Sequence, residues 1–226
     1  MSEIREKVPI FPLYTVLFPG ATLPLHIFES RYLEMMQRVL ETREEIGIAL
    51  IAEGKEVGGP ARPYDVGTLA RVVRMERLED GTLNVRVLGT RRFRVRRLYD
   101  PAPYLQGDVE VVQEPTSDSV RAYALSVKVQ DLWQQYTAMM RRIVGVEVGR
   151  GERPQTALEW AFYVGAGLMC GLKDKQRLLS TWDVADMLAQ EIVLLYRELA
   201  LLRFMAETQQ REEERRLGPT GYISRN

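Results

Sequence analysis

The side chains best suited to catalysis are the chain's one histidine, His26, and its one cysteine, Cys170. An imidazole can deprotonate a thiol when the two lie within hydrogen-bond reach and a third group orients the base. His26 and Cys170 fall in different halves of the chain, and no orienting group can be identified. They also fall short of the three or four ligands that zinc prefers. We therefore expect no catalytic residue, no metal and no cofactor, and a packed or hydrogen-bonded His26.

A run of arginines gives the strongest nucleic-acid signal. In the segment RRFRVRR, residues 91–97, a strand would place Arg92, Arg94 and Arg96 on one face, where they could contact phosphates. The chain carries 31 basic and 31 acidic residues, whereas a nucleic-acid-binding domain is usually basic. We expect an outward strand face paired with acidic neighbours, and an RNA-binding strand is the alternative. The expected acidic partners are Glu76, Asp108 or Glu110.

Two pairs of adjacent methionines are the candidates for polypeptide binding, because methionine adapts to partners of varied shape. The pairs are Met35 with Met36, and Met139 with Met140. If adjacent helix positions cannot both face one core, one member of each pair would reach a surface groove. The plainer interpretation is that these methionines line the edges of the core.

The elements that must position these groups begin in the stretch from Pro9 to Tyr32. Its apolar residues recur mostly at alternate positions, which is typical of strands. Pro12 and Pro24 predict strand starts, edges or bulges, and Pro19-Gly20 predicts a turn. From Ser30 to Thr42 the period becomes 3.6, which predicts an amphipathic helix. Its predicted inward residues are Leu33, Met36, Val39 and Leu40.

Antiparallel strands are expected to follow this helix. A strand-length apolar run covers residues 46–52, and a loop rich in glycine and proline follows it. Asp80-Gly81 is a hairpin signal that joins two strands, and a further turn is predicted at Gly89-Thr90. This spacing suggests a small twisted barrel. The expected strands after the loop cover residues 66–78, 83–88, 92–98 and 105–112.

Beyond Pro115 the pattern is helical, so we expect a β domain over residues 8–115, a helical domain over 116–216 and a tail over 217–226. The last helix, capped by Ser180 or Thr181, carries an apolar seam in four-three alternation. The seam predicts packing within the chain, with a homodimeric coiled coil as the alternative. The seam residues are Leu188, Ile192, Leu195, Leu199, Leu202 and Ala206. The other expected helices cover 119–144, Pro154 to Cys170, and 174–179.

The segment from Pro12 to Glu29 resembles the opening of the Lon N-terminal domain family. Further matches occur in order at residues 66–70, 80–83, 89–95 and 175–179. The resemblance implies an α+β fold: a PUA-like β pseudo-barrel with one inserted helix, then a helical bundle that ends in a long helix. The motif residues, interpreted as structural, are Pro12, Phe18, Pro19, Gly20, Pro24, His26, Gly67, Gly81 and Gly89.

Lon proteases are driven by ATP, but the chain carries no phosphate-binding loop of the pattern Gly-x4-Gly-Lys-Ser/Thr. At its Gly54-Lys55 pair, Ala49 replaces the earlier glycine and Glu56 replaces the hydroxyl residue. The Ser-Lys peptidase of the family lies in a separate domain. We therefore expect neither ATPase nor peptidase activity.

Composition points to an ordinary globular protein, with 46% hydrophobic and 27% charged residues. Glu3 and Glu6 precede the first apolar run, whereas a signal peptide begins with basic residues. The longest apolar run is too short to span a bilayer. A single cysteine suits a reducing compartment. We expect a cytoplasmic bacterial protein with no membrane contact, either a monomer or a homodimer through its last helix. The resemblance implies a non-catalytic recognition module for unfolded, tagged or client polypeptides, or for a protease or chaperone partner.

Overall fold

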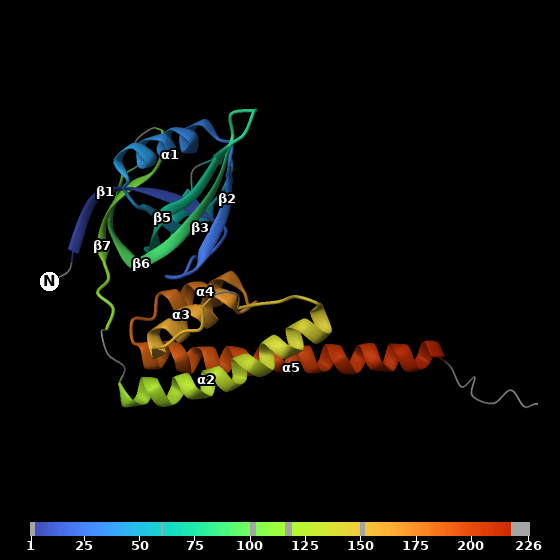
Figure 1. Cartoon of the computed structure of the whole chain (residues 1–226). Coiled ribbons are helices and arrows are strands. Elements are labelled where there is room, and N and C mark those ends of the chain that lie inside the picture. The colour runs from blue at the N-terminus through green and yellow to red at the C-terminus, as the bar shows by residue number, and fades with distance from the viewer. Residues whose placement is uncertain (1–2, 60, 100–102, 116–118, 150–151, 218–226) are drawn as a thin grey trace, which may run out of the picture.

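The computed structural model describes residues 3–59, 61–99, 103–115, 119–149 and 152–217. A β unit comes first in the chain and a layer of helices follows it (Figure 1). Helix α1 (Ser30–Thr42) covers the side of the β unit that faces away from the other helices. The strands are β1 (Glu3–Leu13), β2 (Thr22–Ile27), β3 (Ile46–Gly54), β4 (Ala61–Pro63), β5 (Val66–Arg77), β6 (Leu83–Tyr99) and β7 (Gln106–Val111).

The sheet closes on itself through its first strand. Strand β1 pairs antiparallel with β7 and parallel with β3, so the order β1, β7, β6, β5, β3 returns to β1. Strand β2 adds to β6, and β4 adds to β3. Pro24 lies in β2, for which β6 is the one partner strand in the described structure. This edge position tolerates proline, which cannot donate to a ladder.

The prediction of a turn at Gly89-Thr90 is wrong, because β6 runs without interruption from Leu83 to Tyr99. It pairs with β5 on both sides of this point, and a register shift lies opposite it between Leu69 and Ala70. Gly89 serves a close approach: a Cβ atom there would lie 2.5 Å from the Phe18 carbonyl oxygen. The hairpin predicted at Asp80-Gly81 is confirmed, since it joins β5 to β6.

Helix α1 has the predicted bounds, and it packs over one of three apolar clusters found among the described residues. Leu40, which was expected to face inward, is 36% exposed, and Tyr32 and Met35 are buried in the core instead. A second cluster surrounds Phe93 inside the sheet. The largest cluster joins the helices to Phe18 of the β unit, so the two layers share a core.

The helical layer is built on two long helices that run parallel. Their direction follows from an ion pair of 2.9 Å between Arg121 and Asp186 near their starts, and from Lys128 lying 5.4 Å from the ring centre of Tyr196 further along. The two shorter helices lie between this pair and the β unit (Figure 1). The last helix extends past its neighbours. The helices are α2 (Val120–Met139), continued by a π-helical turn (Met140–Val144), α3 (Ala157–Gly167), α4 (Leu172–Leu179) and α5 (Val184–Leu217).

Two helix starts differ from the prediction for local reasons. Helix α3 starts at Ala157 and not at Pro154, because the Thr156 side chain accepts the Glu159 N–H and Glu159 caps Thr156 in return. Helix α5 starts after Asp183, whose carboxylate accepts the Asp186 N–H at 2.8 Å, and not after Ser180 or Thr181. A carboxylate also suits the positive end of the helix dipole.

The apolar seam of α5 packs inside the molecule. Its residues from Leu188 to Leu202 are buried in the helical cluster, which confirms the intramolecular interpretation. Among the described residues, no helix is long and apolar enough to cross a membrane. The predicted tail beyond Leu217 lies outside the described residues.

Candidate functional site

Three of the four candidate methionines are buried. Met35 and Met36 are fully buried, Met140 is buried, and Met139 is half-buried against the helical cluster. The prediction that one member of each pair reaches a groove is wrong for Met35 and Met36. Adjacent helix positions differ by about 100°, and the apolar arc of a core-facing helix is wide enough to hold both.

Arg92 lies at the junction between the layers and is not open to solvent, since its side chain is 1% exposed. Its guanidinium binds Glu114 in a bidentate pair, with Nε–Oε1 and Nη2–Oε2 distances of 2.6 Å. Nη1 donates to the carbonyl oxygens of Leu179 at 3.0 Å and Thr181 at 2.5 Å. The Arg92 guanidinium of β6 therefore holds the segment between α4 and α5 in place.

The other two candidate arginines, Arg94 and Arg96, are also engaged. The Arg94 guanidinium stacks 5.0 Å from the ring centre of Trp182, which Arg92 contacts at 4.8 Å. Arg96 pairs with Glu110, so this predicted acidic partner is confirmed. The prediction of one outward arginine face is wrong at Arg92, because the helical layer covers that part of the strand. The buried Arg92 is therefore not available to a phosphate backbone, although Arg94 and Arg96 remain exposed.

Two of the motif glycines, Gly67 and Gly89, lie with Phe18 where backbones or layers approach closely, whereas Gly20 and Gly81 adopt positive φ angles with open space around them. A Cβ atom at Gly67 would lie 2.4 Å from the Ile48 carbonyl oxygen. The Phe18 ring packs on α3, where a Cβ atom at Gly165 would lie 2.7 Å from it. Gln176 of α4 donates to the Val66 carbonyl of β5 at 2.9 Å. These contacts support a structural interpretation of the motif.

The structure does not bring His26 and Cys170 together. His26 is exposed on β2 and shares a hydrogen bond of 3.0 Å with Asn84. Cys170 is half-buried beyond α3, and this burial raises the pKa of its thiol. In the described parts of the chain, no group of three or more His, Cys, Asp or Glu side chains could hold a metal ion.

One titratable residue that sequence analysis did not single out is Glu191, in the first third of α5. It has no exposed surface, and neither carboxylate oxygen meets a hydrogen-bond donor with good geometry among the described residues. Burial raises its pKa well above the usual value, and the nearby Gly165 backbone offsets only part of this effect. Burial therefore favours the neutral, protonated form of the Glu191 carboxyl.

An exposed apolar row runs along one side of α5. Val193, Tyr196, Ala200 and Phe204 recur at intervals of three and four, so they lie along one side of the helix. Val193 and Phe204 are each 67% exposed, and Tyr196 is 50% exposed. We call these four residues the α5 stripe. The sequence carries a signal for this stripe, because its apolar residues fall outside the four-three seam that predicts the buried face of the helix.

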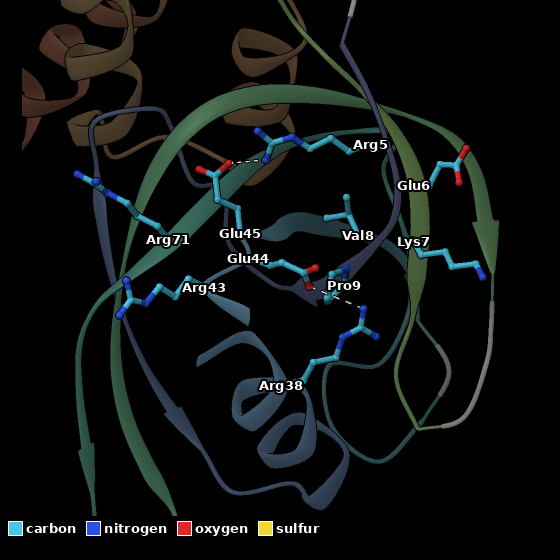
Figure 2. A pocket seen from close by; sticks show the side chains of 10 residues that line it. All are labelled: Arg5, Glu6, Lys7, Val8, Pro9, Arg38, Arg43, Glu44, Glu45 and Arg71. Atoms are coloured by element: carbon cyan, nitrogen blue, oxygen red, sulfur yellow. Dashed lines mark hydrogen bonds and ion pairs between the residues drawn. The ribbon is translucent and has the colours of Figure 1, made fainter. Parts of the chain in front are cut away.

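A charged hollow lies on the opposite part of the molecule, beside the end of α1 (Figure 2). Its volume is about 650 Å³, and buried Val8 and Pro9 form its apolar part. The charged residues that line it are Arg5, Glu6, Lys7, Arg38, Arg43, Glu44, Glu45 and Arg71. Two ion pairs cross it, Arg5–Glu45 at 2.6 Å and Arg38–Glu44 at 3.7 Å.

Comparison with known proteins gives one consistent result. A family model described as the ATP-dependent protease La (LON) substrate-binding domain matches residues 7–197. Lon protease 2 of Myxococcus xanthus is 27% identical over 205 residues, which cover 89% of this chain and 25% of the relative. Lon protease of Dictyoglomus thermophilum is 26% identical over 209 residues, which cover 92% and 26%. The chain thus spans about a quarter of the length of these relatives.

Solved structures share the mixed arrangement of a sheet with helices. The Lon N-terminal domain protein from Xanthomonas campestris aligns with a TM-score of 0.63 at 26% identity, covering 83% of this chain and 97% of that one. The N-terminal domain of Mycobacterium avium complex Lon protease has the same fold, with a TM-score of 0.59 at 20% identity and coverage of 84% and 98%.

Proposed function

The chain belongs to the family of ATP-dependent protease La (LON) substrate-binding domains, and we propose that it is a non-catalytic module that binds client polypeptides in unfolded or tagged form. The observation that carries the proposal is the α5 stripe. Large apolar side chains scattered singly on a surface need no explanation, but a continuous row of them is typical of an interaction site. The buried face of the same helix is fixed in the core, so the row is held in place.

The partner that fits this stripe is an extended segment with apolar and aromatic side chains. From Val193 to Phe204 the helix rises about 16 Å, which is the length of about five residues of extended chain. Charged Arg197 and Arg203 flank the row on exposed positions. A folded protein keeps its apolar segments inside, whereas an unfolded one presents them, so the stripe favours unfolded clients.

The test is a binding titration followed by fluorescence anisotropy. The probe is labelled hen lysozyme that has been reduced and blocked with iodoacetamide, which is unfolded and carries net positive charge. The double variant Tyr196→Glu, Phe204→Glu should bind it at least about tenfold more weakly, because two charges interrupt the stripe. The control Gln209→Glu adds a charge to the same helix beyond the stripe, and it should bind like the wild type.

Equal affinity of the double variant and the wild type would contradict the proposal, provided that circular dichroism shows both to be folded. Sedimentation equilibrium on the same proteins tests whether a second copy of the chain covers the stripe instead. If the wild type is a dimer and the double variant is a monomer, the stripe is an interface between two copies of the chain and not a client site.

We extend the proposal to finer points of the fold and the partner. The closed order of β1, β7, β6, β5 and β3 suits a PUA-like pseudo-barrel. We propose residues 8–115 as the β unit of the chain and residues 116–216 as its helical unit. A protease or a chaperone is the proposed onward partner in the cytoplasm. No ATPase or peptidase chemistry is assigned to this chain.

A further inference from the structure

The charged hollow beside α1 has an unusual combination of shape and charge. Figure 2 shows Arg43 and Arg71 on one side and Glu6 and Lys7 on the other, with Val8 and Pro9 between them. Five cationic and three anionic side chains line it, which gives a formal excess of two positive charges. The hollow therefore offers an apolar floor within a basic rim.

The excess charge lies on residues that the chain itself does not neutralise. Glu45 is engaged by Arg5, by the Thr90 hydroxyl at 2.5 Å and by Arg91 at 3.8 Å. Glu44 is engaged by Arg38. Within the described part of the chain, no ion pair reaches the side chain of Lys7, Arg43 or Arg71, and all three are exposed. Two guanidinium forks and one ammonium group are thus open to an anion.

The backbone at two of these cations points to a role beyond the fold. Lys7 has φ 51° and Arg43 has φ 57°, and among the described residues they are the two non-glycine residues at positive φ. Arg43 is the left-handed cap at the end of α1, a position where glycine is strongly preferred. Cationic side chains therefore occupy positions where the fold alone favours glycine, and such outliers cluster at binding sites.

We propose that this hollow binds an acidic segment of a client polypeptide. Carboxylates of Asp or Glu would pair with the guanidinium forks of Arg43 and Arg71, since planar forks match carboxylate geometry. An apolar neighbour in the segment would rest on Val8 and Pro9. The inference deepens the proposed recognition of polypeptides and depends on it. It names the chemistry of a second contact, separate from the α5 stripe.

A nucleic acid fits the hollow less well than an acidic peptide. Glu6, Glu44 and Glu45 interrupt the cations of the lining, so a phosphate backbone, which carries a charge at every step, would not meet a continuous basic surface. A peptide can alternate carboxylates with apolar side chains and so match both the rim and the floor. The volume of about 650 Å³ suits a few side chains.

The test uses a labelled 12-residue peptide in which Asp and Glu alternate with Leu, and a matched peptide with Asn and Gln in place of the acids. The wild type should bind the acidic peptide at least about tenfold more tightly. Arg43→Gly and Arg71→Ala should each weaken its binding by about tenfold. The control Arg62→Ala removes the same charge from an exposed position on β4, outside the hollow, and should change binding by less than twofold.

Arg43→Gly separates binding from folding, because glycine suits this backbone and the variant should melt at the same temperature as the wild type or higher. The proposal is overturned if both hollow variants bind the acidic peptide like the wild type. It is also overturned if a 12-residue oligouridylate displaces the peptide at the same concentration as unlabelled peptide does. The unfolded lysozyme probe is basic, so its binding to the α5 stripe is measured independently: if it binds and the acidic peptide does not, this inference alone fails.

Discussion

At the scale of single residues, Glu191 combines full burial with the lack of a well-placed hydrogen-bond donor. A buried carboxyl of this kind binds its proton more tightly in the folded than in the unfolded chain. The contribution of this bound proton to the free energy of unfolding is therefore fully present below the ordinary Glu pKa. The contribution is lost as pH rises toward the raised pKa of the folded state, because the unfolded chain releases its proton first.

Glu191→Gln should stabilise the protein at neutral pH, since the amide has a similar shape and no proton to lose. The difference in unfolding free energy should be near zero at pH 4 and grow by up to about 1.4 kcal/mol per pH unit above the ordinary Glu pKa. Urea unfolding followed by circular dichroism between pH 4 and pH 8 measures it. Glu207→Gln, at a 67% exposed side chain of the same helix, is the matched control. A difference between Glu191→Gln and the wild type that does not vary with pH would show that Glu191 titrates normally.

At the scale of elements, β6 is the strand whose length the sequence pattern does not predict. Helix α1 and the hairpin at Asp80-Gly81 could be predicted, because periodicity and turn chemistry are local signals. The continuity of β6 through Gly89 could not be. A glycine that allows the Phe18 carbonyl to come close has the same sequence signature as a glycine in a turn.

Gly89→Ala should therefore destabilise the fold by about 1 to 3 kcal/mol, because its Cβ would be forced against a backbone oxygen at 2.5 Å. Thermal or urea unfolding measures the loss. Gly59→Ala is the control, since a Cβ there meets its nearest atom, on Lys55, at an ordinary 3.7 Å. If the two variants are equally stable, the backbone at Gly89 is free to relax and the close approach does not matter.

At the scale of the whole molecule, Arg92 links the β unit to the helices. One guanidinium joins β6 to Glu114 and to the turn between α4 and α5. Its burial also explains why the candidate sites could be predicted only in part. The alternation of arginines along the strand is visible in the sequence, but the carbonyl groups that bind Arg92 belong to residues 87 and 89 positions later. The charged hollow is assembled from distant segments in the same way.

Arg92→Met should destabilise the whole chain by about 3 kcal/mol, because it leaves a partly buried carboxylate and two carbonyls without their donor. Glu114→Gln alone should also destabilise. The double variant should lose less than the sum of the single losses, with a coupling of about 1 to 3 kcal/mol, when measured by urea unfolding at pH 7. Strictly additive losses would mean that the two side chains do not act as a pair.

The pairing of β1 also bears on how the protein is made. Of the strands in this sheet, β1 is translated first. Its end, Ile10–Leu13, pairs with β3, and its start pairs with β7, where Glu3 lies opposite Val111. Translation of the roughly 100 residues between these partners takes about 5 to 20 s at 5–20 residues per second. For that interval the first part of the nascent strand, from Glu3 to Pro9, lacks its partner strand. Its unpaired backbone groups are then open to chaperones or to aggregation, until β7 emerges and closes the ring.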